Sequence, residues 1–181
     1  MIATPLAIQD VLVLQPDVLG DERGFFFESF NQRAFDQAAG KRVSFVQDNH
    51  SRSLKNVLRG LHYQVQQPQG KLLRVIFGEI FDVAVDLRRT SRTFGHWVSA
   101  RLSAENKKQI WVPQGFAHGF LVLSDSAEVL YKTTDYYAPE HDRCICWDDP
   151  HIGITWPTEQ APTLSARDKS GIRFAEADVF T

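Results

Sequence analysis

Cysteine is scarce in this chain, which carries only Cys144 and Cys146 among its 181 residues. Proteins that depend on disulfides are mostly secreted and cysteine-rich, so this low number fits a reduced, cytoplasmic protein. Two thiols at this spacing, with no second pair elsewhere, are also a weak signal for a zinc site. We therefore expect neither a disulfide framework nor a structural metal.

Long apolar runs and an excess of positive charge are absent as well. No run approaches the length needed to span a membrane, and the first five residues do not begin a secretory signal. The formal net charge of −2 argues against a general role in binding nucleic acid or membrane surfaces. A local basic pocket remains compatible with that charge.

Aromatic residues, in contrast, are plentiful, with thirteen Phe and four Trp. They indicate a large apolar core, a stacking site, or both. A chain of this length, 43% of it hydrophobic, can bury one substantial core. Because we find no internal repeat, low-complexity segment or linker, we expect a single domain over residues 1–181.

Short β-forming runs at regular spacing predict a mainly β protein, a sandwich or a barrel. Apolar residues at every second position of residues 81–87 predict a half-buried strand. The best helix is Gln32–Ala39, with Asn31 to cap its start and Gly40 just past its end. Residues 21–24 predict a turn, and the tail predicts irregular chain with short helices. The expected strands are residues 8–14, 25–30, 44–48, 57–64, 72–77, 81–87, 96–102, 109–112, 116–123 and 128–134.

The chemistry points first to residues 56–64, which read NVLRGLHYQ. If this run is extended, His62 shares a face with Leu58 and Gly60, unless Gly60 marks a bulge that re-aims the strand. A buried imidazole needs a partner, and Arg59 with the nearby Lys71 would suit an anionic substrate. The alternative is a satisfied core histidine beside two surface cations, the commoner outcome for an isolated histidine in a strand.

A second motif, WVPQGFAHGF at residues 111–120, places Pro, Gly and His at the offsets P-x-G-x-x-H. It resembles the second motif of the cupins, which are jelly-roll β-barrels. Metal-binding cupins carry H-x-H in their first motif, whereas this chain has His62-Tyr63-Gln64. Because metals held by imidazole and carboxylate usually need three or more protein ligands, the resemblance supports the barrel and argues against a metal.

Eight blocks in order closely resemble the dTDP-4-dehydrorhamnose 3,5-epimerase family, and the likeness runs from about residue 8 to residue 168. The resemblance implies a cupin-type jelly-roll barrel with a few short helices, acting as a homodimer. It also implies inversion of both carbons beside the ketone of dTDP-4-keto-6-deoxy-glucose, without metal or cofactor, in dTDP-L-rhamnose synthesis. The blocks are GFFFES at 24–29, FVQDNHS at 45–51, LRGLHYQ at 58–64, QGK at 69–71, FDVAVD at 81–86, LSAENK at 102–107, PQGFAHGF at 113–120 and LYKTT at 130–134.

By this resemblance His62 is the base, Tyr131 the acid on the opposite face, and Lys71 lies near the developing enolate oxygen. Asp168 matches the carboxylate that orients the histidine. Sequence alone leaves an alternative open for Asp168, because Ser165-x-x-Asp168 also resembles a capping box.

Further positions match family contacts to the substrate. Tyr136 could stack on the base, and Gln47 and Asn49 match residues that reach the nucleotide from a partner subunit. The family often has Lys where Arg167 stands, and the loop at residues 65–69 looks shorter than in some relatives. The expected substrate-binding residues are Arg23, Glu28, Gln47, Asp48, Asn49, Arg59, Lys71, His118, Tyr136, Asp142 and Arg167.

Three other functions remain to be weighed against this one. The nearest is epimerisation at a single carbon, or keto-isomerisation, on the same scaffold. A metal-dependent cupin oxygenase would need ligands that His62-Tyr63-Gln64 does not supply. A sugar-nucleotide binding protein without activity would leave His62 and Tyr131 without a reason to be paired.

Overall fold

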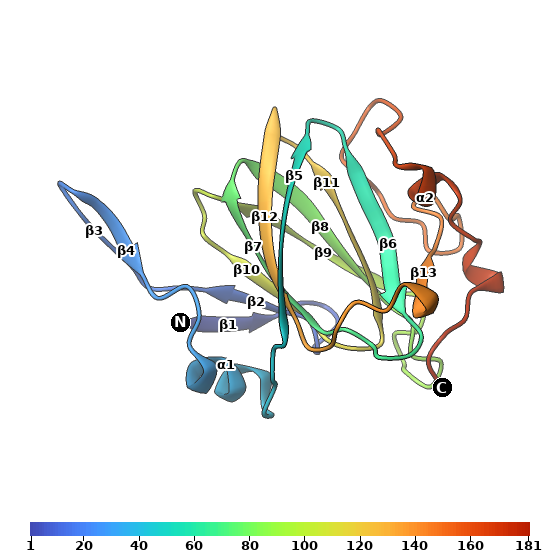
Figure 1. Cartoon of the computed structure of the whole chain (residues 1–181), viewed down its shortest axis with the longest axis horizontal. Coiled ribbons are helices and arrows are strands. Elements are labelled where there is room, and N and C mark those ends of the chain that lie inside the picture. Colours follow the sequence, from blue (N-terminus) through green and yellow to red (C-terminus); the bar gives the residue numbers. More distant parts are fainter.

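Two antiparallel β-sheets packed face to face form the body of the protein (Figure 1), and the computed structural model describes residues 1–181. The larger sheet consists, in spatial order, of β1 (Ile2–Pro5), β2 (Leu12–Gln15), β10 (Gln109–Val112), β7 (Lys71–Phe77), β12 (Ser126–Thr133) and β5 (Gln47–Leu54). The smaller sheet consists of β13 (Asp142–Cys144), β6 (Leu58–Gln64), β11 (Phe116–Val122), β8 (Glu79–Asp86) and β9 (Trp97–Ser103). This arrangement confirms the prediction of a mainly β fold.

Apolar side chains fill three layers of this structure. One cluster, which includes Leu73, Phe116 and Val129, lies between the sheets. A second covers the outer face of the smaller sheet, where the C-terminal segment packs. The third lies on the outer face of the larger sheet, where Phe35 of helix α1 (Gln32–Ala39) meets Trp111 with 5.2 Å between ring centroids. Burial of these three layers is the main force that holds the fold together.

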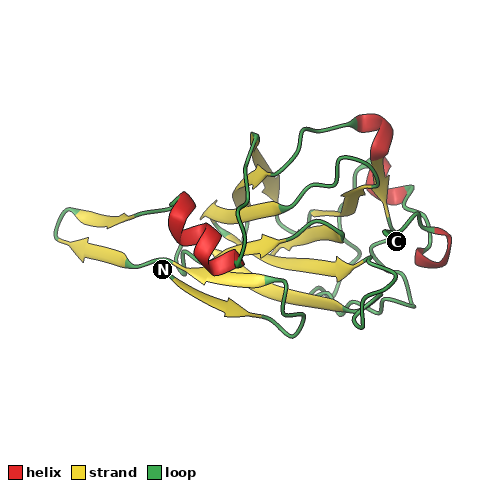
Figure 2. Ribbon diagram, turned by 90° about the horizontal axis from the view of Figure 1, so that it is seen from below, coloured by secondary structure: helices red, strands yellow, loops and turns green.

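A hairpin of β3 (Val18–Asp21) and β4 (Gly24–Phe27) pairs only with itself and projects from the barrel (Figures 1 and 2). Its turn lies at residues 22–23, as the sequence predicts. Leu19 and Phe26 are 68% and 72% exposed. An isolated hairpin is marginal in water, and exposed apolar surface of this kind marks an interaction site.

The local signals for the helix are confirmed. Helix α1 spans Gln32–Ala39, the Asn31 side chain accepts a hydrogen bond from the Ala34 backbone, and Gly40 adopts a left-handed conformation with φ of 68°. Strand β10 also has the predicted bounds.

Several strand predictions need correction. Strand β5 covers Gln47–Leu54 instead of residues 44–48, β2 begins at Leu12 instead of residue 8, and β4 ends at Phe27. Strands β1, β3 and β13 were not predicted. The error at β5 has a physical cause: polar side chains occupy both faces of this strand, so its sequence shows no apolar alternation.

Strand β8 is buried on both faces, so the prediction of a half-buried strand was wrong. Asp82 and Asp86 are fully buried, as are Val83 and Val85 on the other face. The C-terminal segment covers the apolar face of β8, so this face is buried as well as the face that carries the two carboxylates. The two carboxylates face the space between the sheets, where they meet polar partners.

The tail combines irregular chain with short helices, as predicted. It contains η1 (Pro139–His141), α2 (Ala166–Lys169) and η2 (Phe174–Glu176), and it runs beside β6 and β13 (Figure 1). The Tyr63 hydroxyl donates to the Asp178 carbonyl at 2.7 Å, and the Phe180 backbone donates to the Leu87 carbonyl at 3.0 Å. No helix of the chain has the length and apolar character required to cross a membrane.

Candidate active site

A cavity of about 180 Å³ lies between the two sheets and contains six of the predicted site residues. They come from both sheets and from α2, so the cavity has chemically different walls. Three cationic side chains make it a local basic pocket despite the net negative charge of the chain. Its lining consists of Ser51, Arg59, His62, Lys71, Leu73, His118, Phe120, Tyr131 and Arg167.

His62 faces this cavity because β6 is irregular at Gly60. The register places two residues of β6, Gly60 and Leu61, opposite the single Gly119 of β11. A Cβ atom on Gly60 would lie 2.5 Å from the Gly119 Cα, so the close approach of the two strands requires glycine. The extra residue puts both Arg59 and His62 at the cavity, while Leu61 packs on the opposite face of the sheet.

His62 is paired with Asp168, and the two atoms His62 Nε2 and Asp168 Oδ1 lie 2.6 Å apart. Burial lowers the pKa of His62 below its usual value, and this outweighs the rise caused by Asp168. Burial alone would raise the pKa of Asp168, but hydrogen bonds from His62 and Ser165 lower it to about 2. The pair therefore joins a carboxylate to an imidazole that is neutral near pH 7, with Nδ1 as the ring nitrogen left to accept a proton.

Asp168 takes part in a helix cap and also pairs with His62, so both interpretations of this residue apply. Ser165 caps α2 by accepting a hydrogen bond from the Asp168 backbone, and its hydroxyl donates to Asp168 Oδ2 at 2.6 Å. The backbone of Gly60 donates to Asp168 Oδ1 at 3.3 Å. The cap thus fixes the carboxylate that meets His62.

Lys71 and Tyr131 approach the cavity from the larger sheet, opposite His62. Lys71 Nζ donates to the His62 carbonyl at 3.3 Å, and burial lowers the pKa of Lys71 to about 8. Burial raises the pKa of Tyr131, with Arg59 and Arg167 opposing that rise, so the phenol stays protonated near pH 7. This wall therefore presents one cation and one neutral proton donor.

A second histidine–carboxylate pair lies at the base of the cavity. His118 Nε2 is 2.9 Å from Asp82 Oδ2, and the Asp82 side chain is fully buried. Asp82 was not among the predicted site residues, because its alternation with apolar neighbours indicated a solvent-facing residue. Asp82 could have been identified from its position, because it is a carboxylate in a strand that neighbours a strand with a histidine.

Gln47 and Asn49 lie on the inner face of β5, in the same chain as the cavity. Asn49 pairs with Tyr131, and Gln47 pairs with Thr133, whose other neighbour is Lys71. Directly paired residues point to the same side of a sheet. Both side chains therefore face the barrel of their own chain, whereas the family resemblance predicts that they reach the nucleotide from a partner subunit.

Asp48, which was predicted to bind substrate, does not face the cavity of its own chain. Successive residues of a strand point to opposite faces, and Asp48 lies between two inward residues. Its carboxylate binds Lys132 Nζ at 3.0 Å on the outer face of the larger sheet.

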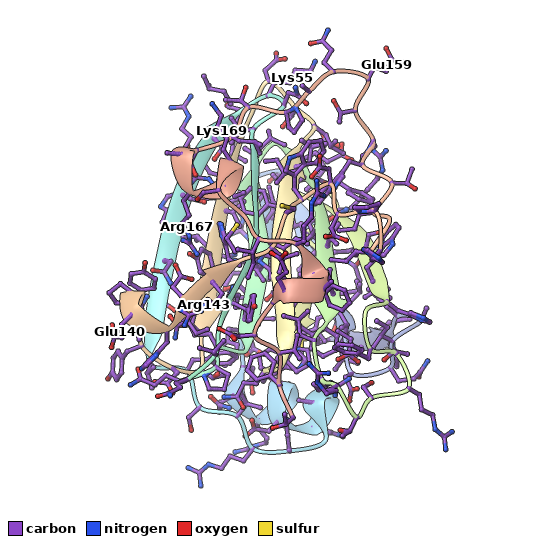
Figure 3. All side chains as sticks on the ribbon, turned by 90° about the vertical axis from the view of Figure 1, so that its right-hand side faces the viewer. Lys55, Glu140, Arg143, Glu159, Arg167 and Lys169 are labelled. Atoms are coloured by element: carbon purple, nitrogen blue, oxygen red, sulfur yellow. The ribbon has the colours of Figure 1, made fainter.

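Arg167, Asp142, Tyr136 and Tyr137 form the rim of the barrel. Arg167, labelled in Figure 3, extends from the C-terminal segment and pairs with Asp142 of β13. The Tyr137 hydroxyl donates to Asp142 Oδ2 at 3.3 Å, and the Tyr137 backbone donates to the Gln47 side chain at 3.1 Å. Tyr136 and Tyr137 are 61% and 53% exposed, and only Tyr136 was among the predicted site residues.

Arg23 and Glu28 are not brought to the cavity of their own chain. Arg23 sits at the turn of the projecting hairpin, where it pairs with Asp21, and Glu28 follows the hairpin and accepts from Asn31. In Figure 1 this hairpin extends away from the barrel, on the side opposite β6. Neither side chain lines the cavity that holds His62.

One group of side chains has donor atoms close enough to hold a metal ion. It joins His62 and Asp168 with the Cys144 thiol, and the three donor atoms lie within 4.8 Å of one another. His118 is not part of this group, since its ring binds Asp82. The two-histidine arrangement of metal-binding cupins is therefore not reproduced.

Known proteins share both the sequence and the structure of this chain. A family profile described as dTDP-4-dehydrorhamnose 3,5-epimerase matches residues 5–176. A protein of that name from Pseudomonas aeruginosa is 66% identical over 180 residues, which cover 99% of each chain. One from Salmonella typhimurium is 60% identical over 169 residues, covering 93% of this chain and 92% of its own.

The similar solved structures include dTDP-6-deoxy-D-glucose-3,5-epimerase from Legionella pneumophila in complex with dTDP-4-keto-L-rhamnose. It superimposes with a TM-score of 0.95 at 50% identity and covers 97% of this chain and 94% of its own. A 3'-monoepimerase from Streptomyces bikiniensis in complex with dTDP-quinovose gives a TM-score of 0.89 at 34% identity, covering 94% of this chain and 87% of its own. These matches confirm the cupin-type jelly roll, and they establish that the chain belongs to the dTDP-4-dehydrorhamnose 3,5-epimerase family of sugar-nucleotide epimerases.

Proposed function

We propose that this protein is a dTDP-4-dehydrorhamnose 3,5-epimerase, which inverts the two carbons beside the ketone of dTDP-4-keto-6-deoxy-glucose in dTDP-L-rhamnose synthesis. One observation carries the proposal. A carboxylate-paired histidine from the smaller sheet and a tyrosine from the larger sheet lie on opposite walls of one cavity. Inversion at carbon requires this arrangement, because a proton must leave one face of the ring and another must arrive at the opposite face.

His62 is the base in this mechanism. A hydrogen on a carbon beside the ketone is acidic because the resulting carbanion delocalises onto the carbonyl oxygen. His62 accepts that proton at Nδ1, while Asp168 holds Nε2–H and stabilises the imidazolium that forms. Tyr131 then donates its phenolic proton to the enolate from the other side.

Lys71 stabilises the enolate oxygen in this scheme. Its pKa of about 8 leaves it largely protonated at pH 7, and it lies on the wall opposite His62. Because little water screens charges in a buried cavity, a cation there stabilises the oxygen on which negative charge develops. Asp82 orients His118 at the base of the same cavity, where the ring can contact the sugar. The chemistry calls for no metal and no redox cofactor.

The nucleotide occupies the rim and needs more surface than one chain provides. Binding sites for small molecules usually have volumes of about 300–1,000 Å³, whereas this cavity has about 180 Å³. The cavity is therefore the sugar subsite. We assign the diphosphate to Arg59 and Arg167, and thymine to the exposed rings of Tyr136 and Tyr137.

The exposed hairpin supports a homodimer. Arg23 and Glu28 match family contacts to the substrate, but they lie on a hairpin that projects from the chain's own barrel. We infer that the hairpin, with exposed Leu19, Phe25 and Phe26, reaches across the partner and delivers Arg23 and Glu28 to the partner's nucleotide. The free thiols of both cysteines support a cytoplasmic location.

Incubation of the purified protein with dTDP-4-keto-6-deoxy-glucose in heavy water tests the function. Deuterium at both carbons beside the ketone, with inversion at both, is the expected result. Deuterium and inversion at one carbon would instead favour the single-carbon activity of the Streptomyces bikiniensis relative. Prior treatment with EDTA should leave the rate unchanged, and a loss that is restored by a divalent cation would overturn the metal-free mechanism.

A further inference from the structure

Cys144 lies beside the proposed catalytic pair and has no part in the mechanism above. Strand β13 places it directly across from His62, because the two residues are register partners. Its sulfur makes only long contacts, 3.8 Å to the Gly60 carbonyl and 3.7 Å to the Ile145 carbonyl. The sulfur is therefore a donor atom without a strong partner, and it sits within 4.8 Å of the donor atoms of His62 and Asp168.

We propose that His62, Cys144 and Asp168 form an inhibitory binding site for a thiophilic divalent cation, with zinc as the representative ion. Zinc binds imidazole nitrogen and carboxylate oxygen at about 2.0 Å and thiolate sulfur at about 2.3 Å, so two donors in a tetrahedral site are about 3.3–3.5 Å apart. The three donor atoms lie within 4.8 Å of one another, and side-chain shifts of up to about 1.3 Å bring the group to this geometry. Three protein ligands of mixed type, with water as the fourth, are an ordinary zinc environment.

Occupation of this site disables the base by a defined exchange of protons. The ion displaces the proton that His62 Nε2 shares with Asp168 Oδ1, and these two atoms, 2.6 Å apart in the free protein, separate to about 3.3 Å to bind it. The single proton of the neutral imidazole then moves from Nε2 to Nδ1, the nitrogen that must accept the substrate proton. The Cys144 thiol gives its proton to solvent and binds as thiolate. No oxidation or reduction is involved.

The inhibitory effect depends on the proposed function, whereas binding of the ion does not. The first experiment therefore titrates the metal-free full-length protein with zinc chloride by calorimetry. We expect one site per chain, with cobalt(II) at that site giving thiolate charge-transfer absorption in the near ultraviolet. The second experiment measures epimerase turnover against zinc concentration, and inhibition should be reversed by EDTA.

Two cysteine variants make the test specific. Cys144→Ser, with Cys144→Ala as a second variant, should keep its basal turnover, lose the charge-transfer band, and need at least about tenfold more zinc for inhibition. Loss of a group that only hydrogen-bonds to a metal ligand already weakens metal binding roughly 10- to 100-fold. Cys146→Ser is the matched control. Its sulfur donates to the Gly171 carbonyl and belongs to no metal-binding group, so this variant should bind zinc like the wild type.

Two results would overturn the proposal. One is wild-type protein that neither binds zinc nor is inhibited by it. The other is equal zinc inhibition of wild type and Cys144→Ser, which would place the ion elsewhere. Protein that binds zinc through Cys144 but has no epimerase activity would support the site while contradicting the proposed function.

Discussion

Two histidines of this cavity are neighbours in the sheet, yet each binds a different carboxylate. His62 meets Asp168, which arrives from the tail, and His118 meets Asp82, which comes from the adjacent strand. A carboxylate fixes which ring nitrogen carries the proton, and therefore which nitrogen is free for chemistry. The two carboxylates come from different elements, α2 and β8, so the two pairs are not interchangeable.

The roles of His62 and Tyr131 can be separated by isotope exchange. His62→Ala should abolish both hydrogen exchange and inversion, with a rate loss on the order of 10²–10⁴ or more, because no enolate forms. Tyr131→Phe should block inversion while His62 still removes a proton and returns one to the same face. Mass and NMR analysis of sugar recovered from heavy water then finds deuterium in unepimerised sugar with Tyr131→Phe only. Near wild-type exchange in His62→Ala would place the base elsewhere.

The pH dependence of kcat/KM should be bell-shaped. His62 must be neutral to accept a proton, and its pKa is lowered, so activity should rise as pH increases through a value below 6.5. Lys71 must be charged to stabilise the enolate, so activity should fall as pH increases through about 8. Lys71→Gln should lower kcat and abolish the alkaline decline. An unchanged alkaline limb in this variant would assign that limb to another group.

Among the structural elements, α1 and β5 show what the sequence could and could not predict. The helix was predictable because Asn31 and Gly40 act locally, within one turn of the residues they cap. The face of a residue on β5 depends on its register with β12, which no local pattern encodes. The sequence block that contains Asp48 matches the family, but this match could not show which face of β5 Asp48 occupies.

The bulge in β6 and the contact between Asp168 and His62 also depend on residues that are far apart in the sequence. Gly60 signalled a bulge, but only the approach of Gly119 determines its direction. The identities of His62, Tyr131 and Lys71 followed from the resemblance, because their blocks are intact in the sequence. Asp82 was missed because the tail buries the apolar face of β8, so the usual inference that the polar face is exposed fails.

The exposed hairpin can be tested by subunit complementation. Arg23→Ala and His62→Ala should each have strongly reduced kcat/KM when pure. A heterodimer of the two contains one site with an intact hairpin arginine and an intact base. Equal co-expression should then recover about one quarter of the wild-type activity, since about half the dimers are mixed and each has one working site. No recovery above the single variants would mean that Arg23 serves no partner site.

For the molecule as a whole, Asp86 ties the end of β8 to the following loop. Its buried carboxylate accepts from Arg88, Ser91 and Thr93, and Arg88 also reaches Asp10 at 2.9 Å. Burial alone would raise the pKa of Asp86, but these hydrogen bonds lower it to about 2. A lowered carboxyl pKa stabilises the fold at pH values above its unfolded value of 3.8, and that stabilisation is lost as pH falls towards 2.

Asp86→Asn should lower the free energy of unfolding at pH 7 by about 1–2 kcal/mol, a value discounted for the partial exposure of Arg88. Its stability should also decline less steeply than that of the wild type between pH 4 and pH 2. Urea unfolding across this pH range measures both effects. Asp10→Asn, at an exposed end of the same network, is the control and should change stability little. Equal losses in the two variants would contradict the role of the buried carboxylate.

The position of Asp168 after every strand in the sequence has a consequence for synthesis. All strands of the two sheets except β13 are made by the end of β12, but Asp168, the partner of His62, is made later, after β13. Chains are made from the N-terminus, and their parts fold as they emerge. A nascent or prematurely terminated chain can therefore assemble the barrel before it can orient its base. Catalytic competence in this protein is acquired only after the strands that form the cavity, when the segment that carries Asp168 has been made.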